Sequence, residues 1–317
     1  MTPPASFAGK KQQGVAIITA LLIVTIAATI SISISTRLQL DVRRTGNMIA
    51  QDQADFYLLA AEKWSQRILR QDKKDTKIDE LSEDWAIEIP PLPVSGGSIQ
   101  GKLTDLHSYI NINSLLATGK VDTTTEKRLT QLFKSLGLKN ISTQAIIDWI
   151  DSDSTTTNPN GAEDGYYLNL DDPYRTANRE LQSISELRLI KGFEDGKSYQ
   201  LLKDYLCAYV AGSDPAINVN TASAEVLKSL SADMTDALAK DIIDHRADNP
   251  FNDLKDFTSF AKLGTIIKDT AKLSTSSDYF LLRTQAIIGQ ANKIMYSIIY
   301  RDGSGKTEII SRSYRTL

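Results

Sequence analysis

The sequence contains few of the residues on which catalytic sites and covalent cross-links usually depend. One cysteine, Cys207, and two histidines, His107 and His245, occur in 317 residues. A single thiol cannot form an internal disulfide, and its setting in YLCAYV indicates a buried cysteine rather than a reactive one. The histidines are far apart in the sequence, and neither an HExxH nor a GxSxG motif is present. These absences argue against metalloproteases and nucleophilic hydrolases, and we expect a protein that is not an enzyme.

An excess of positive charge is also missing, because the formal net charge is −3. The whole chain therefore offers no electrostatic attraction for nucleic acid. The segment INVNTASAEVLKSL, followed by AKDIIDHRADNPF, does resemble helix-hairpin-helix DNA-binding units. Its connection, SADMTD, has no glycine and carries two aspartates that would repel a phosphate. We interpret the unit as a scaffold without the DNA chemistry and expect no nucleic-acid partner.

Charge is absent for longest near the N-terminus, where no charged residue lies between Lys11 and Arg37. The apolar part, 15–34, has 34 − 15 + 1 = 20 residues. A helix of that length spans about 30 Å, the thickness of a bilayer core. A secretory signal peptide has a shorter apolar region and a small-residue cleavage site, and a buried core helix is rarely so long. The pattern predicts a transmembrane helix over 15–36, although basic residues on both sides leave its orientation open.

The stretch KKQQG followed by VAIITALLIV resembles the class III leader of type IV pilins and type II secretion pseudopilins. The resemblance implies that a prepilin peptidase cuts after Gly14 on the cytoplasmic side and methylates Val15, the mature N-terminus. It also implies a single-pass helix in the inner membrane with the bulk of the chain in the periplasm. Most of this superfamily has glutamate at the fifth mature residue, where it is thought to neutralise the N-terminal amine of the subunit above. Here that position is Thr19.

Helical periodicity continues beyond the membrane segment, and strand patterns follow it. Six apolar residues recur mostly at helical spacing and predict an amphipathic half-helix packed on a sheet: Leu38, Val42, Ile49, Phe56, Leu59 and Ile68. The prolines of 89–93 indicate a turn, and 98–106 alternates like a strand. Three further segments, 279–288, 293–302 and 306–315, are typical of antiparallel strands joined by the turns GQAN and GSG.

Between these strand patterns the sequence is mostly helical and contains a faint internal repeat. YININ near residue 109 and INVN near residue 217 each precede a similar helical segment. The predicted fold class is α+β: a pilin-like long N-terminal helix packed on an antiparallel sheet, with a large, mostly α-helical domain inserted. We expect a leader at 1–14, a transmembrane helix at 15–36, the helix spine and first strands at 37–110, the inserted domain at 111–272 and the last strands at 273–317.

A helical module with two similar halves inserted into a pilin sheet resembles the large minor pseudopilin K of type II secretion systems. The resemblance implies a subunit that initiates or caps the tip of the periplasmic pseudopilus, which exports folded proteins across the outer membrane. It implies three kinds of partner: other minor pseudopilins of the I, J and H types, the prepilin peptidase and the inner membrane. Two alternatives stay open, a minor pilin of a type IV pilus and a DNA-uptake protein that uses the hairpin-like unit.

The strongest candidate site is the acidic loop DWIDSDSTTTNPNGAEDGYYLNLDDPYR, which has seven carboxylates from Asp148 to Asp172 and no Lys or Arg before Arg175. Such a cluster favours a hard cation with oxygen ligands, and the K-type resemblance implies calcium. The loop is not an EF-hand, because position six is Thr156 and position twelve is Ala162. The candidate ligands are Asp151, Asp153, Glu163, Asp164, Asp171 and Asp172. The alternative is a solvated acidic loop with Asx turns.

Overall fold

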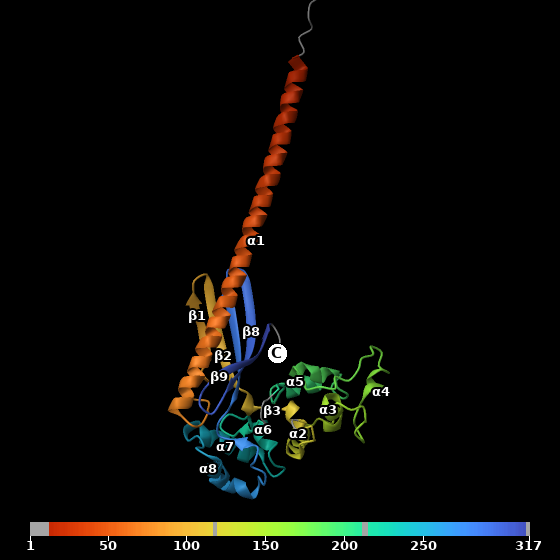
Figure 1. Cartoon of the computed structure of the whole chain (residues 1–317), viewed down its shortest axis with the longest axis vertical. Coiled ribbons are helices and arrows are strands. Elements are labelled where there is room, and N and C mark those ends of the chain that lie inside the picture. Colours follow the sequence, from red (N-terminus) through yellow and green to blue (C-terminus); the bar gives the residue numbers. More distant parts are fainter. Residues whose placement is uncertain (1–12, 117–118, 211–214, 315–317) are drawn as a thin grey trace, which may run out of the picture.

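The computed structural model describes residues 13–116, 119–210 and 215–314, and one long helix dominates its shape (Figure 1). This helix, α1 (Gln13–Asp75), runs unbroken through 63 residues and projects its N-terminal half away from the body. Among the described residues it is the one helix long and apolar enough to cross a membrane, and its most apolar window is 0% buried. Residues 1–12 of the predicted leader lie outside the described residues.

The body is built on one five-stranded antiparallel sheet in the order β1-β2-β7-β8-β9. Its strands are β1 (Ile89–Val94), β2 (Gly97–Asp105), β7 (Tyr279–Ile288), β8 (Ala291–Arg301) and β9 (Thr307–Tyr314). β2 pairs with β7 from Gly97↔Ile288 to Asp105↔Phe280, so the chain leaves the sheet after β2 and returns to its neighbour. The helical domain occupies the sequence between these two strands, which confirms the predicted α+β fold with an inserted helical domain.

The prediction of a turn at 89–93 is wrong, because these residues form most of β1, an edge strand. Pro90, Pro91 and Pro93 cannot donate a backbone hydrogen bond, and an edge strand is where a sheet tolerates that loss. The register of β1 against β2 is also interrupted between Ile89 and Leu92.

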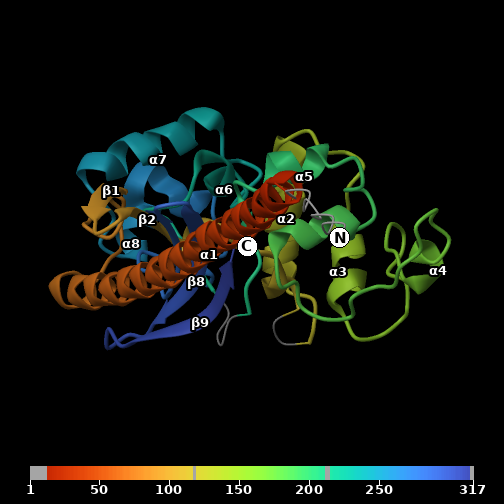
Figure 2. The same ribbon diagram turned by 90° about the horizontal axis from the view of Figure 1, so that it is seen from above.

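The inserted domain consists of short helices and two small parallel ladders. Its helices are α2 (Thr123–Ser135), α3 (Thr143–Ile150), α4 (Asp164–Tyr167), α5 (Lys197–Leu202), α6 (Ala224–Lys228), α7 (Asp236–Asp248) and α8 (Leu254–Ser259), with 3-10 turns at Leu106–Ser108, Ile112–Leu115, Ile184–Leu189 and Phe260–Thr265. The ladders pair β3 (Ile110–Asn111) with β4 (Leu206–Cys207) and β5 (Ile217–Asn218) with β6 (Leu273–Ser274). Figures 1 and 2 show α2–α5 on one side of the molecule and α6–α8 on the other.

The faint repeat in the sequence corresponds to a repeated hydrogen-bonding device. Asn113 accepts from the backbone N–H of Leu181 at 2.9 Å and donates to its carbonyl oxygen at 2.9 Å. Asn220 makes the same pair of bonds to Phe251, at 2.9 and 3.0 Å. Both asparagines are buried, so each satisfies backbone groups of a distant segment that would otherwise lack partners. The two halves of the domain are thus closed in the same way.

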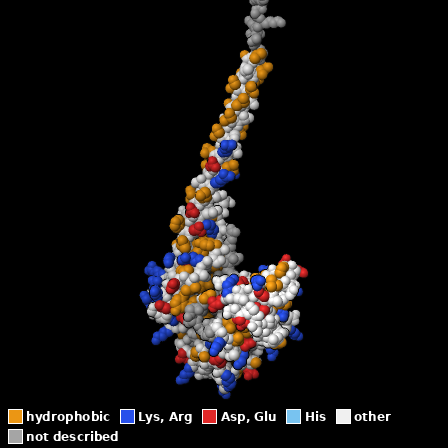
Figure 3. Space-filling model, turned by 45° about the vertical axis from the view of Figure 1, so that its right-hand side comes forward, with side chains coloured by type: hydrophobic (Ala, Val, Ile, Leu, Met, Phe, Trp, Pro, Cys, Tyr) orange, Lys and Arg blue, Asp and Glu red, His pale blue; other side chains and the backbone are white. Residues whose placement is uncertain are grey.

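The outward face of α1 differs from the sequence prediction. Leu38, Val42, Ile49 and Phe56 are 61–72% exposed, and Leu59 is 39% exposed, so the predicted sheet-packing face points into solvent. Only Ile68 of the predicted set packs against a buried cluster. The face that contacts the sheet carries Ala54, Leu58 and Leu69, which pack on β7 and β8. Figure 3 shows hydrophobic side chains along the upper part of α1, with charged ones further down.

Candidate metal centre

The acidic loop begins at the C-terminal end of α3, and three of its carboxylates converge there. One oxygen each of Asp148, Asp151 and Glu163 lies within 4.8 Å of the other two. Asp148 is fully buried, Glu163 is 4% exposed and Asp151 is half-buried. Asp148 and Asp151 stand three residues apart at the end of the helix, and Glu163 returns to them immediately before α4.

Glycine permits this close approach of the loop to the helix. A Cβ atom at Gly161 would lie 2.1 Å from Oδ2 of Asp148 and 2.4 Å from the carbonyl oxygen of Thr157, so no larger residue fits there. Both oxygens of Asp148 accept from the backbone N–H of Thr157 at 3.1 Å. Lys191 donates from Nζ to the carbonyl oxygen of Gly161 at 3.1 Å. This bond holds the part of the loop that returns to α3.

Two buried oxygens in this group have no hydrogen-bond partner among the described residues, namely Oδ1 of Asp151 and Oε1 of Glu163. Burial, together with the charges of Asp148 and Asp151, raises the pKa of Glu163 to about 7. Burial and the neighbouring Asp153 and Asp148 raise the pKa of Asp151. Unpartnered carboxylate oxygens that repel one another at short range fit the donor set of a hard divalent cation such as calcium.

The other predicted ligands lie outside this group. Asp164 binds Arg175, whose Nη1 is 2.6 Å from Oδ2, and its Oδ1 accepts from the backbone N–H of Thr176 at 3.1 Å. The bonds from Thr176 and the charge of Arg175 hold the pKa of Asp164 low. Asp153 is exposed and accepts from the N–H of Thr155 at 2.7 Å, an Asx turn.

Asp171 and Asp172 are exposed, so of the predicted ligands the structure brings together only Asp151 and Glu163. Asp148 joins them, although the sequence pattern places it in the acidic loop and not among the predicted ligands. Its position three residues before Asp151 on an amphipathic helix was the feature that could have identified it.

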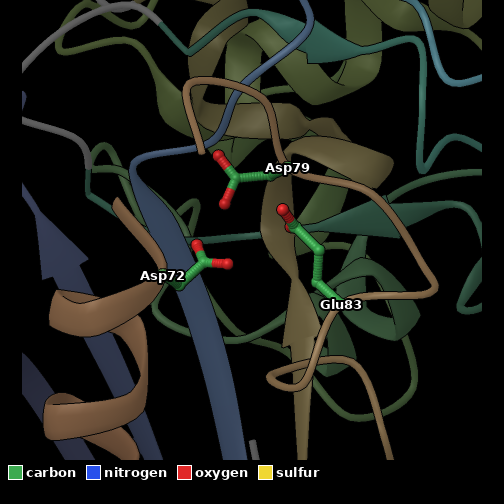
Figure 4. A group of neighbouring side chains, drawn as sticks. All are labelled: Asp72, Asp79 and Glu83. Carbon is green, nitrogen blue, oxygen red and sulfur yellow. The ribbon is translucent and has the colours of Figure 1, made fainter. Parts of the chain in front are cut away.

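A second group of carboxylates, Asp72, Asp79 and Glu83, was not predicted at all, and Figure 4 shows the three side chains turned toward one another. Arg301, whose side chain is 0% exposed, neutralises part of the negative charge of this group. Its Nη1 donates to Asp72 at 2.6 Å, and its Nη2 donates to Asp79. Glu83 accepts from Thr76, Trp85 and the N–H of Glu80 at 2.7–3.0 Å. This group is held by an arginine and fits a structural role better than a cation site.

The remaining residues considered for chemistry are engaged in packing. Cys207 is buried, as predicted, and burial raises the pKa of its thiol well above the usual range. His107 is buried, stacks with Tyr279 and has its pKa lowered to about 4 by that burial. His245 is half-buried and stacks on Phe260 at 4.4 Å between ring centroids, so it too is part of the packing of the domain.

The hairpin-like unit also turns its arginine inward. Arg246 on α7 is 7% exposed, and it donates to the carbonyl oxygens of Val219 and Ala222, each at 2.6 Å. A guanidinium used in this way closes the loop before α6 and is not directed at a phosphate. The unit has the geometry of an internal support.

Comparisons with known proteins agree with this architecture. Two family models, both described as type II secretion system protein K, match residues 108–211 and 217–276. The chain is 33% identical to type II secretion system protein K of Aeromonas hydrophila, over 96% of this chain and 97% of that protein. It is 30% identical to the protein of that name from Pseudomonas aeruginosa, over 95% and 92% of the two chains.

A solved structure is also similar. It is the GspK-GspI-GspJ complex from the type 2 secretion system of enterotoxigenic Escherichia coli. One of its chains matches with a TM-score of 0.73 and 25% identity, and the match covers 86% of this chain and 100% of that one.

Proposed function

The chain belongs to the type II secretion system protein K family, and from this premise we propose that it is the subunit that initiates or caps the pseudopilus tip. As a minor pseudopilin it is a component of the secretion apparatus, and its work is assembly rather than catalysis. The two alternatives, a type IV pilus subunit and a DNA-uptake protein, are not favoured by the family to which it belongs. On this proposal α1 anchors the chain in the inner membrane and the rest lies in the periplasm.

The main support for a position at the tip is the presence of threonine at residue 19. Its Oγ1 donates to the carbonyl oxygens of Val15 and Ala16, each at 3.0 Å. The hydroxyl group therefore finds its hydrogen-bond acceptors within its own helix. A glutamate at this depth would need a charged partner from a subunit above, because an unpaired carboxylate in a membrane helix is costly. A first subunit has no such neighbour, and threonine needs none.

The position of the helical domain supports the same proposal. Figure 1 shows it at the end of the molecule opposite the projecting N-terminal half of α1, where it widens the body beyond the sheet. In a filament that grows from the membrane, this end points away from the membrane. A subunit stacked above would meet the helical domain, whereas subunits added below would not.

The expected partners are the other minor pseudopilins, since the similar solved complex joins GspK to GspI and GspJ. An H-type pseudopilin and the prepilin peptidase complete the set that we propose. Site-specific crosslinking in cells tests the tip position. We expect crosslinks to I- and J-type subunits from one side of the chain only, and none between two copies of this chain. Copies found along the filament shaft would contradict the proposal.

We also propose that Asp148, Asp151 and Glu163 bind calcium. What supports this is the set of convergent carboxylates with two buried oxygens that lack partners among the described residues. A bound calcium ion would supply two positive charges at this point. The chain's own residues would then tie the returning loop, through Glu163, to the end of α3, through Asp148 and Asp151.

A further inference from the structure

The acidic loop contains the one asparagine of the sequence that is followed by glycine, Asn160 before Gly161. In this dipeptide the asparagine side chain can react with the next backbone nitrogen, because glycine has no Cβ atom to obstruct the approach. The side chain of Asn160 is exposed and lines an open groove beside Ser142 and Gln144, so water reaches it. The loop therefore carries the ingredients of a spontaneous deamidation one residue before the glycine that packs against Asp148.

The reaction is an intramolecular substitution followed by a hydrolysis. The backbone nitrogen of Gly161 attacks Cγ of Asn160 and forms a C–N bond, while the side-chain amide leaves as ammonia together with the proton of the Gly161 N–H. The product is a cyclic succinimide. Water then opens the ring at one of its two carbonyl carbons and leaves either aspartate or isoaspartate at position 160. One water is consumed and one ammonia is released, so the step needs no enzyme and no oxidant.

The folded loop holds Gly161 in a position that blocks this ring closure. Its N–H donates to the carbonyl oxygen of Thr157 at 2.8 Å, and its own carbonyl oxygen accepts from Nζ of Lys191 at 3.1 Å. A Cβ atom at this residue would lie 2.1 Å from Oδ2 of Asp148, so the backbone has no room to turn. The Gly161 nitrogen must lose its bond to Thr157 before it can attack Asn160. Deamidation therefore requires a local opening of the loop.

The carboxylates that we propose as calcium ligands control this opening. Glu163 follows Gly161 by two residues and meets Asp148 and Asp151 of α3. An ion bound by all three ties the returning part of the loop to the helix, and the loop opens only after the ion is released. Calcium at a hundredfold excess over Kd would lower the population of the open loop about a hundredfold. When opening is fast relative to a slow chemical step, the rate of that step follows the open population.

We propose that Asn160 is a deamidation site whose rate is set by calcium at Asp148, Asp151 and Glu163, and that deamidation makes the loss of the ion irreversible. The inference rests on the calcium binding proposed above. In isoaspartate the backbone runs through the former side chain, which adds one carbon between residue 160 and Gly161. The longer backbone displaces Gly161 and Glu163 from α3, so the three carboxylates no longer converge.

The test measures deamidation in the full chain in detergent, at one pH and at a temperature well below melting. One sample contains calcium at a hundredfold excess over Kd and the other contains a chelator. Peptide mapping by mass spectrometry follows residue 160 and also Asn113, a buried asparagine followed by serine. Asn113 is the internal reference, because it would react faster only if the inserted domain unfolded as a whole.

Two double variants complete the design. Asp151→Ala with Glu163→Ala removes two of the three proposed ligands, and Asp171→Ala with Asp172→Ala removes two exposed carboxylates of the same loop. The first variant should deamidate at residue 160 as fast with calcium as with chelator. The second should behave like the wild type.

We expect the chelator to accelerate deamidation of Asn160 in the wild type at least about tenfold, with no change at Asn113. The isolated isoaspartate form should show no rise in melting temperature with calcium. Equal rates at Asn160 in a wild type whose melting temperature does respond to calcium would overturn this inference alone. An equal acceleration at Asn113 would overturn it too, since the whole domain would then be unfolding. If the melting temperature did not respond, the calcium proposal would fall with it, whereas the tip position is tested separately by crosslinking.

Discussion

Asp151 and Glu163 each bury a carboxylate oxygen with no partner among the described residues, and at the scale of single residues this is the feature with the clearest consequence. Calcium that binds only the folded chain stabilises it by about 2.7 kcal/mol at a hundredfold excess over Kd. We therefore expect a chelator to lower the melting temperature of the full chain in detergent. Asp151→Ala combined with Glu163→Ala should remove that shift.

Asp171→Ala with Asp172→Ala is the matched control, because it deletes two exposed carboxylates of the same loop. This variant should keep the response to calcium. If the chelator left the melting temperature of the wild type unchanged, the calcium proposal would be wrong and the loop would be a solvated acidic segment.

Gly14 supports a second prediction at this scale. If the leader resemblance holds, the peptidase requires this glycine before Val15, and Gly14→Leu should leave an unmethylated precursor of full length in the membrane. Gly9→Leu, which changes another glycine of the leader, should be shortened normally. Mass spectrometry of the N-terminus distinguishes the products. A shortened, methylated Gly14→Leu chain would sink the leader assignment.

At the scale of elements, the sequence predicts which segments are helices and strands better than it predicts what they face. The strand predicted at 279–288 is β7, with the same bounds. The face of α1 was assigned wrongly because periodicity finds apolar stripes but does not say which one meets the sheet. Here the bulky stripe is left outside, and Ala54 and Leu58 let the helix approach β7 and β8 closely.

The same limit hid the carboxylate group at the end of α1. Asp72 and Asp79 are brought to Arg301 by the sheet, from positions more than two hundred residues apart. A pattern of neighbouring residues in the sequence cannot predict a contact between such distant positions. In the acidic loop, by contrast, Asp151 and Glu163 could be predicted, because local charge density is visible in the sequence. Which of its carboxylates converge depends on the path of the loop around Gly161.

Arg301 gives the prediction at this scale. Arg301→Met would leave Asp72 and Asp79 without their cation in a buried setting, and breaking a buried ion pair in this way costs about 3–5 kcal/mol. Chemical denaturation of the full chain in detergent measures the loss. Lys293→Met is the control, since its pair with Asp55 is partly exposed and worth only about 0–1 kcal/mol. Equal losses in the two variants would show that Arg301 is not the residue that ties α1 to the sheet.

At the scale of the whole molecule, the two parts of α1 serve different purposes: one anchors the subunit in the membrane and the other holds the folded body. The first part of α1, up to Thr36, is uncharged and exposed, as expected of a membrane anchor, and its C-terminal half is fixed to the sheet on one side only. The inserted domain lies at the far end, where it widens the molecule (Figure 1). A subunit of this shape has a free side for neighbours along the helix and an obstructed end.

This asymmetry determines what a charged residue at Thr19 would do. If the chain occupies the tip, Thr19→Glu gains no amine from a subunit above and instead places a carboxylate in the membrane helix, at a cost below the about 2.5–3.5 kcal/mol that applies at the centre of a span. We expect fewer pseudopili and less exported protein when this variant replaces the wild type in cells. Thr19→Ser, which keeps the hydroxyl bonded to Val15 or Ala16, should support normal export. A Thr19→Glu chain that assembled better, and was found along the shaft, would mean that subunits do stack above it and that the inserted domain is no obstacle.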